Sequence, residues 1–501
     1  MTAIITEKFR QHNADQFFES FSEAAPTVYY MLIGKTTPFT STTSGGSDST
    51  PPTPADDVSG EYHIWDQTIA GKKIATSDVT YAIPRRNWVN STTYDMYEDD
   101  VSSSNLSTSG QASIYQSTFY FRTADNRVYK VLDNNGGTAY SGSEPTSESN
   151  TPFAQGGYVI KYMYSITAAE QTKFLTTDFM PVSTDSAVST AAVDGQIESL
   201  IVTGGVSYTD GTYYVGVNGD GANAGTSSGA VISFAVVSGA IKSFGLISGS
   251  DTIVYAGGAG YTYGTITLTD ATVFANAALS TAVDTGDINN GSGGVIKVII
   301  SPKEGHGNDA VAELGGHYVL MNTLFIGAER DDLQVGNDFR NIAISTNPTT
   351  YGTATVASDQ TIRQSFAAKL TSLSGTFVVD EKITQASTAA TGRVVGYDSD
   401  NGILYYQQER FTDYGTNSVG AYIAFSGANV ITGATSGATG TPDSTADSAV
   451  TLANGFTVTF ADGYVNPELQ PDSGNIIYTE NRSPISRAAD QTEDIKIVVE
   501  F

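Results

Sequence analysis

The side chains that most often carry chemistry are few in this sequence and widely separated. The four histidines lie at positions 12, 63, 306 and 317, and no two of them have the short spacing of a helical zinc-binding pair. Cysteine is absent, which excludes disulfides, a thiol nucleophile and thiolate metal sites. No glycine-rich loop ends in the Lys-Ser or Lys-Thr of a phosphate-binding loop. The sequence therefore predicts no catalytic site, no cofactor and no metal.

Two stretches rich in Asp and Asn have the residue types of a calcium loop. They are N-G-D-G-A-N at residues 218–223 and D-S-D-N-G at residues 398–402. Calcium prefers carboxylate and carbonyl oxygens, but neither stretch leads to the closing Glu of an EF-hand. The same residue types are typical of tight turns, which is the interpretation that we favour. Acidic pairs such as Asp331-Asp332 arise by chance among 53 Asp and Glu residues.

Two adjacent arginines beside a tryptophan, Arg85, Arg86 and Trp88, are the most distinctive polar cluster. Arg and Trp side chains often dominate the binding energy of protein interfaces. The two arginines could equally serve the fold by neutralising the acids of residues 95–100. The sequence leaves both interpretations open.

The composition indicates a β-rich protein. The 501 residues are enough for several domains and include 51 Gly, 28 Tyr and 22 Phe, which favours strands and turns over helices. There are 25 Lys and Arg against 53 Asp and Glu, a net charge of −28, so the surface should repel nucleic acid and anionic lipid. No apolar run reaches the roughly 20 residues of a membrane span. The first ten residues lack the apolar core of a signal peptide.

The elements that would position these residues begin with the closing segment, residues 473–501. Within it, residues 476–479 are β-prone and residues 480–484, E-N-R-S-P, predict a polar corner. Apolar and polar residues then alternate to the end, so one face of a final strand should be buried. A lone strand or hairpin is marginal in water, so we expect this strand to close the main sheet. Short helices are predicted at residues 13–21, 168–174 and 309–314, and residues 400–402, D-N-G, predict a hairpin turn.

Two stretches differ from the rest in composition and contain internal repeats. In residues 191–295, which are rich in Gly, Ala, Ser, Thr and Val, residues 197–204 recur imperfectly as residues 241–248. In residues 352–462, a ten-residue tract that begins at Ile383 recurs 48 positions later. Duplication of β units at unequal spacing predicts two small inserted β domains. The remaining residues would form one core in three parts, at 1–190, 296–351 and 463–501.

Several tracts occur in an order that resembles one known family. They are I-T-E-K-F-R at 5–10, A-I-P-R-R-N-W at 82–88, G-Y-V-I-K-Y-M-Y-S-I at 157–166, F-R-N-I-A-I-S-T-N-P at 339–348 and the closing segment. Each tract is short, but their shared order is specific. The sequence resembles the baseplate wedge subunit, gene product eight, of T-even-type contractile-tailed bacteriophages. It departs from that family in its two insertions, at Asn87, where Asp is usual, and at Ser483, where Pro is usual.

The resemblance implies a fold, a role and partners. The fold is a layered β-sandwich with short helices in loops, and the role is structural rather than enzymatic. The protein would be a homodimer that binds other baseplate wedge proteins in the virion tail, after synthesis and assembly in the host cytoplasm. No nucleic acid, membrane span or small-molecule substrate is expected. Residues at or beside subunit contacts are predicted to be Arg85, Arg86, Trp88, Glu480, Asn481, Arg482, Asp490 and Gln491.

A tail fibre or spike adhesin that binds host surface glycans is the alternative interpretation. Repeats rich in Gly, Ser and Thr and many tyrosines would suit such a protein. Fibres, however, are usually trimers with long repetitive shafts, and the repeats here occupy only two stretches of the chain.

Overall fold

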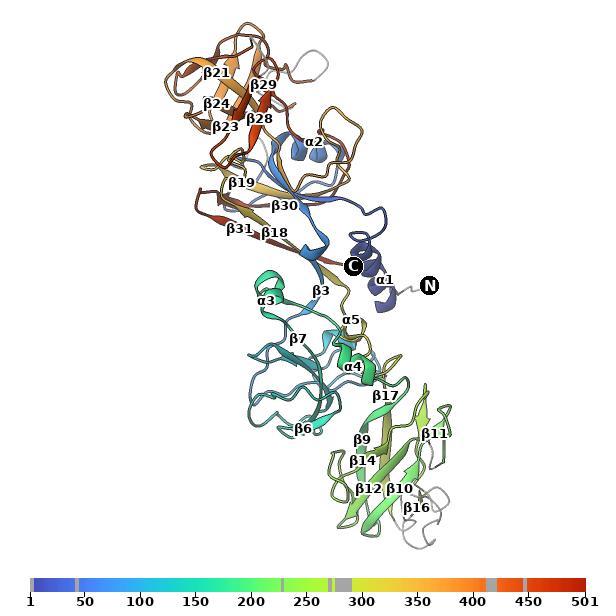
Figure 1. Ribbon diagram of the computed structural model, residues 1–501. Helices are drawn as coiled ribbons and strands as arrows, with labels where there is room; N and C mark the ends of the chain where they lie inside the picture. Colours follow the sequence, from blue (N-terminus) through green and yellow to red (C-terminus); the bar gives the residue numbers. More distant parts are fainter. Residues whose placement is uncertain are drawn as a thin grey trace. The chain divides into compact units, whose positions relative to one another are not determined.

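The computed structural model describes residues 4–40, 45–226, 229–268, 273–274, 291–410, 421–444 and 448–501. Their regular structure is mainly strand, with five short α-helices, which confirms the predicted β-rich, sandwich-like class (Figure 1). Contacts group the chain into two units. Unit 1 holds residues 1–16, 80–320 and 498–501, and unit 2 holds residues 17–79 and 321–497. The predicted inserted domains, 191–295 and 352–462, fall in unit 1 and unit 2 respectively, and their status as insertions stays a prediction.

The helices are short and are set by their capping residues. They are α1 (Glu7–Glu19), α2 (Val58–Gln67), α3 (Ala168–Phe174), α4 (Ser186–Ala191) and α5 (Ala310–Glu313). The predictions at 168–174 and 309–314 are confirmed, and the Thr167 hydroxyl and the Asp309 carboxylate accept main-chain hydrogen bonds at the two helix starts. The start predicted at Asn13 is wrong. Helix α1 begins six residues earlier, where the Thr6 hydroxyl accepts a hydrogen bond from Phe9 N at 3.3 Å.

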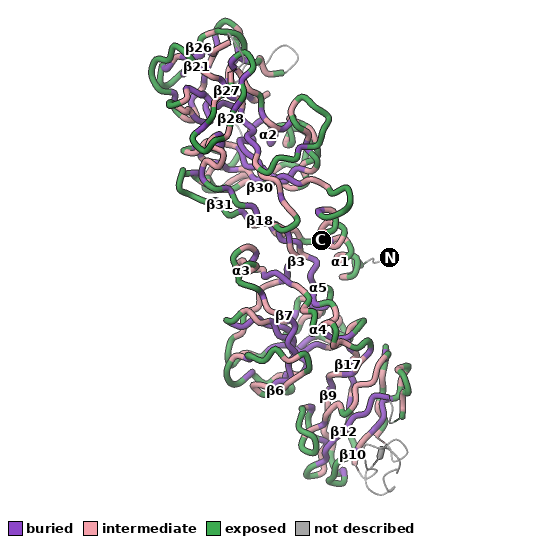
Figure 2. The backbone as a smooth tube through the Cα atoms, in the orientation of Figure 1, coloured by how far each residue is buried: buried purple, intermediate pink, exposed green. Residues whose placement is uncertain are grey.

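One tyrosine-rich sheet is central to unit 1. Its order is β4-β5-β7-β6, from β4 (Tyr120–Arg122), β5 (Arg127–Asp133), β7 (Tyr158–Ser165) and β6 (Phe153–Gln155). Strand β7 is buried on both faces except at its last residue, and Figure 2 shows it buried over most of its length. Its run of Tyr, Val, Ile and Met has the continuous apolar character of a strand covered on two sides. Beside it, β3 (Val79–Pro84) pairs with β8 (Phe179–Pro181).

A second group of strands in unit 1 has its own apolar core. Strands β9 (Ile197–Val206) and β17 (Ser292–Ile300) pair antiparallel along most of their length. The neighbouring sheet has the order β13-β12-β10-β16, with β14 also paired to β12. Its strands are β10 (Gly211–Gly216), β12 (Val231–Val237), β13 (Ala240–Ile241), β14 (Ile253–Ala256) and β16 (Val273–Phe274), and β11 (Asn218–Gly219) pairs with β15 (Gly264–Thr265). Buried Leu200, Val215, Ile232 and Phe234 belong to the shared core.

Unit 2 contains a five-stranded antiparallel sheet. Its order is β20-β2-β1-β19-β30, from β20 (Thr361–Arg363), β2 (Thr68–Ile74), β1 (Tyr29–Gly34), β19 (Asp338–Thr346) and β30 (Asn475–Ser486). Central strand β1 is buried at every position. Strand β30 lies at the edge of the sheet and β31 (Thr492–Glu500) pairs with β18 (Tyr318–Ile326). In β31, Glu493, Ile495 and Ile497 are buried, so the predicted alternation of the last strand is confirmed.

A small β-barrel also lies in unit 2. The order β24-β23-β22-β25-β26-β21 is closed into a ring by pairing of β24 with β21, and β29 adds to β21. The strands are β21 (Phe366–Ser374), β22 (Lys382–Gln385), β23 (Ala390–Asp398), β24 (Ile403–Gln407), β25 (Ile431–Gly433), β26 (Thr439–Pro442) and β29 (Tyr464–Val465), and a separate hairpin joins β27 (Ser448–Thr451) to β28 (Thr457–Phe460). The predicted hairpin turn at 400–402 is confirmed, because β23 and β24 pair across it.

A fully buried ionic network connects the tyrosine-rich sheet of unit 1 to helix α5. Lys130 of β5 pairs with Glu313, and its ammonium group lies 3.6 Å from the ring centre of Tyr97 and 2.8 Å from His306 Nδ1. The second Glu313 oxygen accepts a hydrogen bond from Gly307 N at 2.6 Å. Burial lowers the pKa of Lys130 to about 8. Burial opposes ionisation of Glu313 too, but the attraction of Lys130 brings the pKa of that carboxyl down to about 2, so both groups are charged at neutral pH.

We predict that Glu313→Gln destabilises the fold by about 3–5 kcal/mol, because it leaves the buried Lys130 ammonium without its counter-charge. Glu148→Gln is the matched control, since Glu148 pairs with Arg127 at the surface and the change should cost less than about 1 kcal/mol. Denaturant unfolding of both variants measures the difference. An equal loss in the two variants would contradict the prediction.

The same pair predicts a pH dependence. The pKa of Glu313 is depressed from its ordinary 4.5 to about 2, so its stabilisation is complete above pH 4.5 and is lost as the pH falls toward 2. The gap in unfolding free energy between the native protein and Glu313→Gln should therefore narrow across this window. A constant gap from pH 5 to pH 2 would contradict the assignment.

Candidate assembly interface

Arg85 and Arg86 follow the end of β3 and are half-buried. The Arg85 guanidinium donates to the Thr176 carbonyl at 2.7 Å, and the Arg86 guanidinium donates to the Tyr115 carbonyl at 2.8 Å. Arg86 also stacks on the ring of Tyr120, 4.3 Å from its centre, and burial lowers its pKa. Each guanidinium is therefore held by one main-chain carbonyl, while the buried Nη1 of Arg86 has no hydrogen-bond partner among the described residues.

The nearby acids are satisfied by other groups. The Asp95 carboxylate accepts hydrogen bonds from Ser109 N and Thr118 N, each at 2.6 Å. Lys297 lies 2.8 Å from Asp100. The hydrogen bonds of Arg85 and Arg86 given above go to carbonyl oxygens, and Arg86 also packs on an aromatic face. Asp95 still attracts Arg86 electrostatically, so the interpretation that these arginines neutralise residues 95–100 stays a prediction.

Trp88 is half-buried and packs edge-on against the ring of Tyr140, with ring centres 5.9 Å apart. Its main-chain N–H donates to the Arg122 carbonyl at 2.8 Å. The indole Nε1 is buried and has no hydrogen-bond partner among the described residues. Trp88 is therefore positioned by the same sheet that holds Arg86, and the two side chains are parts of one local structure.

Glu480, Asn481 and Arg482 lie inside strand β30. The polar corner predicted here is wrong. The strand continues through Pro484, and register shifts in its pairing with β19 accommodate the irregular sequence. Because β30 is an edge strand, Pro484 can occur without removing a ladder hydrogen bond that a second neighbour would need.

The side chains of this part of β30 differ in how firmly they are held. Asn481 donates to the Pro52 carbonyl at 3.0 Å and accepts from the Asn341 amide at 2.9 Å. Arg482 is 51% exposed, and its ion-pair partner among the described residues is Glu480 on the same strand, at 2.9 Å. Arg482 is thus the most accessible charged group of this segment.

Asp490 and Gln491 are exposed in the turn between β30 and β31. The Gln491 carbonyl accepts from Gly327 N at 2.8 Å, so its main chain is fixed while its side chain is exposed. The structure thus places Arg85, Arg86 and Trp88 in unit 1 and the other five predicted residues in unit 2. It brings each group together locally, and the assignment of both groups to subunit contacts stays a prediction.

Local hydrogen bonds hold the two stretches rich in Asp and Asn. The Asp220 carboxylate accepts from Thr262 N at 2.9 Å, and the Asp398 carboxylate accepts from Asp400 N and Asn401 N at 3.0 Å. Each carboxylate therefore stabilises the turn in which it lies. Among the described residues, no three His, Asp or Glu side chains are grouped as a metal site.

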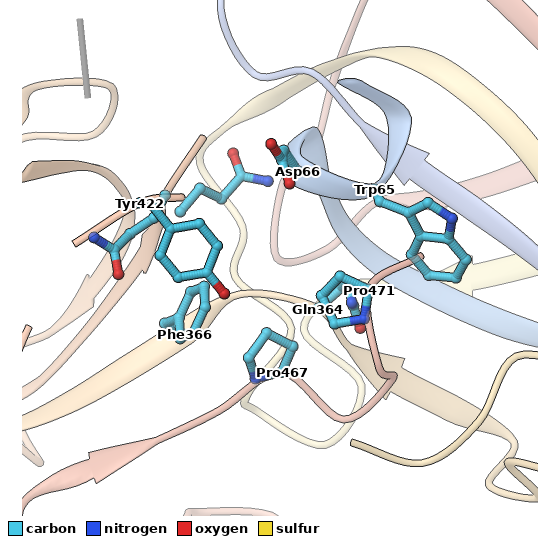
Figure 3. Close-up of a pocket in the computed structure, with 9 residues that line it drawn as sticks. Trp65, Asp66, Gln364, Phe366, Tyr422, Pro467 and Pro471 are labelled. Carbon is cyan, nitrogen blue, oxygen red and sulfur yellow. The ribbon is translucent and has the colours of Figure 1, made fainter. Parts of the chain in front are cut away.

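A recess in unit 2 is lined by Trp65, Phe366, Tyr422, Pro467 and Pro471 (Figure 3). Its volume is only about 10 Å³, which is room for at most one water molecule. Asp66 at its rim is paired with Arg410, which also binds Asp472. Segments that are far apart in the sequence pack tightly around this recess, so it offers no space for a substrate.

Sequence reasoning missed one larger feature, a groove of unit 1 with a volume of about 740 Å³. Its walls come from α1, from residues 97–101 and 114–115, and from residues 300–317. His12 and His317 both line it, although they are 305 positions apart. No sequence signal joins these segments, because only tertiary packing brings them to one place.

Comparison with known protein families indicates which class of protein this chain resembles. The sequence matches the family model described as Bacteriophage T4, Gp8, over residues 3–137 and 450–501. No curated protein matches the sequence with significance. The fold and the match define a β-rich structural protein of a phage tail baseplate.

Both ends of the chain match the Gp8 family in order, which confirms the resemblance to baseplate wedge subunits. Its location is accordingly the tail baseplate of the virion. Residues 138–449 lie outside the matched segments. No helix in the described part of the chain is long and apolar enough to cross a bilayer.

We predict that Arg86→Glu and Arg482→Glu differ sharply in stability. Arg86→Glu places a carboxylate against the face of Tyr120 and opposite the Tyr115 carbonyl, which should cost about 3 kcal/mol or more. Arg482→Glu changes an exposed side chain and should cost less than about 1 kcal/mol. Thermal and denaturant unfolding of the two purified variants make the comparison. A stable Arg86→Glu protein would show that the half-buried guanidinium is dispensable for the fold.

Proposed function

We propose that this protein joins neighbouring wedge proteins during assembly of a contractile tail, as a structural part without catalytic activity. The observation that carries the proposal is the match of both chain ends to the Gp8 family. All eight predicted contact residues lie in the matched segments, three in residues 3–137 and five in residues 450–501. A joint of this kind needs wide complementary surfaces and fixed elements to present them, rather than a cavity for a substrate.

Strand β30 supports a role in joining subunits. It runs from Asn475 to Ser486 and, in the described part of the chain, pairs on one side only, with β19. An edge strand presents unpaired main-chain donors and acceptors, which is a common way for one protein to bind another. The exposed Arg482 and Glu480 on this strand supply charges that could set the register of such a contact.

We further propose that residues 191–295 and 352–462 are additions to the family fold. Each has an apolar core built largely from its own residues, such as Val215, Ile232 and Phe234 in the first and Ile383, Val394 and Leu404 in the second. The first stretch and most of the second lie outside the matched segments, which supports this proposal. The adhesin alternative gains no support from the family match, which points to the baseplate.

The homodimer is tested by the mass of the purified chain in solution. Sedimentation equilibrium should give twice the 52.7 kDa of one chain. A trimer would contradict the homodimer and agree with the fibre-like alternative. A monomer at all accessible concentrations would also contradict it.

The joining role is tested by Arg482→Glu in a co-assembly experiment with the other wedge proteins. The change places a second carboxylate beside Glu480, and we expect the affinity for the assembled partner to fall by at least about tenfold, or about 1.4 kcal/mol. Lys242→Glu is the matched control, because Lys242 is also exposed, the change in charge is the same, and the residue lies outside the matched segments. Equal affinities of the two variants would contradict an interface at this part of β30.

A further inference from the structure

Hydrogen bonds and ion pairs hold the walls of the 740 Å³ groove of unit 1. The wall contributed by α1 is held by three contacts. Tyr81 OH donates to Asp15 at 2.9 Å, Glu7 lies 3.3 Å from His317 Nδ1, and Arg10 pairs with Glu500 at 3.1 Å. The opposite wall includes Glu313, which the buried Lys130 holds in place. The volume is in the range that accommodates a short peptide segment or a drug-sized molecule.

The groove is strongly acidic. Seven carboxylate side chains line it against two lysines, Lys8 and Lys303. The acids come from all its walls, with Glu7 and Asp15 on α1, Glu98 and Asp99 on the segment after Met96, and Glu304 and Asp309 before α5. Burial raises the pKa of Glu98 and Asp99, so an incoming positive charge would stabilise their ionised forms.

A second observation points to an occupant. Ser301 is among the residues that line the groove and is only 7% exposed, and its hydroxyl has no hydrogen-bond partner among the described residues. A buried hydroxyl without a partner costs free energy, which a ligand donor or acceptor would recover. The groove thus combines space, negative charge and one unused hydrogen-bonding group.

We propose that this groove binds a cationic segment, rich in Lys or Arg, of a neighbouring baseplate protein. That the segment comes from a baseplate protein rests on the proposed function. The alternative of a second copy of this chain fits poorly, because the chain carries 53 acids and 25 Lys and Arg. A single divalent cation also fits poorly, because the acids are spread along the walls and the described residues form no metal-ligating group. An extended segment matches such a spread of charge, since each of its side chains can meet a different carboxylate.

The binding test uses the full chain and fluorescein-labelled hexalysine, measured by fluorescence anisotropy at about 0.1 M salt, where contacts beyond about 10 Å are screened. Glu98→Gln/Glu304→Gln removes two groove charges with little change of shape. Glu144→Gln/Glu148→Gln removes two carboxylates of unit 1 that lie outside the groove and are likewise hydrogen-bonded in the native protein. We expect the groove variant to bind at least fivefold more weakly and the control to change by less than twofold. An equal loss in both would mean diffuse binding to an acidic surface and would overturn the proposal.

A second pair of variants is chosen so that the expected result is stronger binding, which misfolding could not produce. Lys303→Glu adds negative charge at the groove, and Lys242→Glu adds the same charge at an exposed position that does not line it. Lys303→Glu should strengthen hexalysine binding at least threefold relative to Lys242→Glu. No difference between them would overturn the proposal even if both proteins are folded.

A co-assembly experiment separates this proposal from the proposed function. If native protein joins the wedge proteins and Glu98→Gln/Glu304→Gln joins them at least fivefold more weakly, both proposals are supported. If that variant joins them normally, the groove proposal fails while the joining role stands. If native protein does not join wedge proteins at all, the joining role fails, and the hexalysine measurements alone decide whether the groove binds cationic segments.

Discussion

The buried pair of Lys130 and Glu313 is the interaction on which much of unit 1 depends. Lys130 is on β5, in the middle of the tyrosine-rich sheet, and Glu313 is the last residue of α5. The pair therefore fixes a short helix, and the loop through His306 and Gly307, against a sheet nearly two hundred residues earlier in the sequence. Two charges withdrawn from water are stable only together, so neither partner can be lost without cost to the other.

This pair also explains how a surface of unit 1 is shaped. Glu313 is part of the wall of the acidic groove, and Asp309 caps the helix that carries it. The buried Lys130 forms an ion pair with Glu313, one of the groove carboxylates. The lysines that line the groove itself are Lys8 and Lys303. Lys130 thus offsets the charge of Glu313, while six other carboxylates line the groove. Packing and surface electrostatics are connected through one ion pair.

The predicted contact residues divide by burial into two kinds. Arg86 and Trp88 are embedded in local packing, with Tyr120 and Tyr140 as their neighbours. Arg482, Asp490 and Gln491 present exposed side chains from an edge strand and the turn after it. An interface residue must be accessible before binding, so the second kind has the stronger physical case. The first kind shapes the surface by holding the chain after β3 in place.

The sequence by itself determined the β-rich class, the helices at 168–174 and 309–314, the turn at 400–402 and the alternation of β31. These features depend on local patterns, namely capping residues, turn residues and period-two burial, that a few neighbouring residues specify. The resemblance to the family was also readable, because several short tracts occur in the family's order along the chain. The start of α1 at Glu7 was missed because Asn13 also has the residue type of a helix N-cap, although it lies inside the helix.

Only the tertiary structure decided the features that depend on distant segments. The sequence around Glu480, Asn481 and Pro484 predicts a polar corner. In the structure these residues belong to an edge strand, which pairs with β19. The partners of Arg85 and Arg86 are carbonyls at positions 176 and 115, which no spacing rule could single out. Glu7 and His317 both line the acidic groove, and no spacing rule could predict this because the two residues are far apart in the sequence. Local sequence specifies conformation through short-range bonds, whereas long-range contacts are chosen by the global arrangement of buried surfaces.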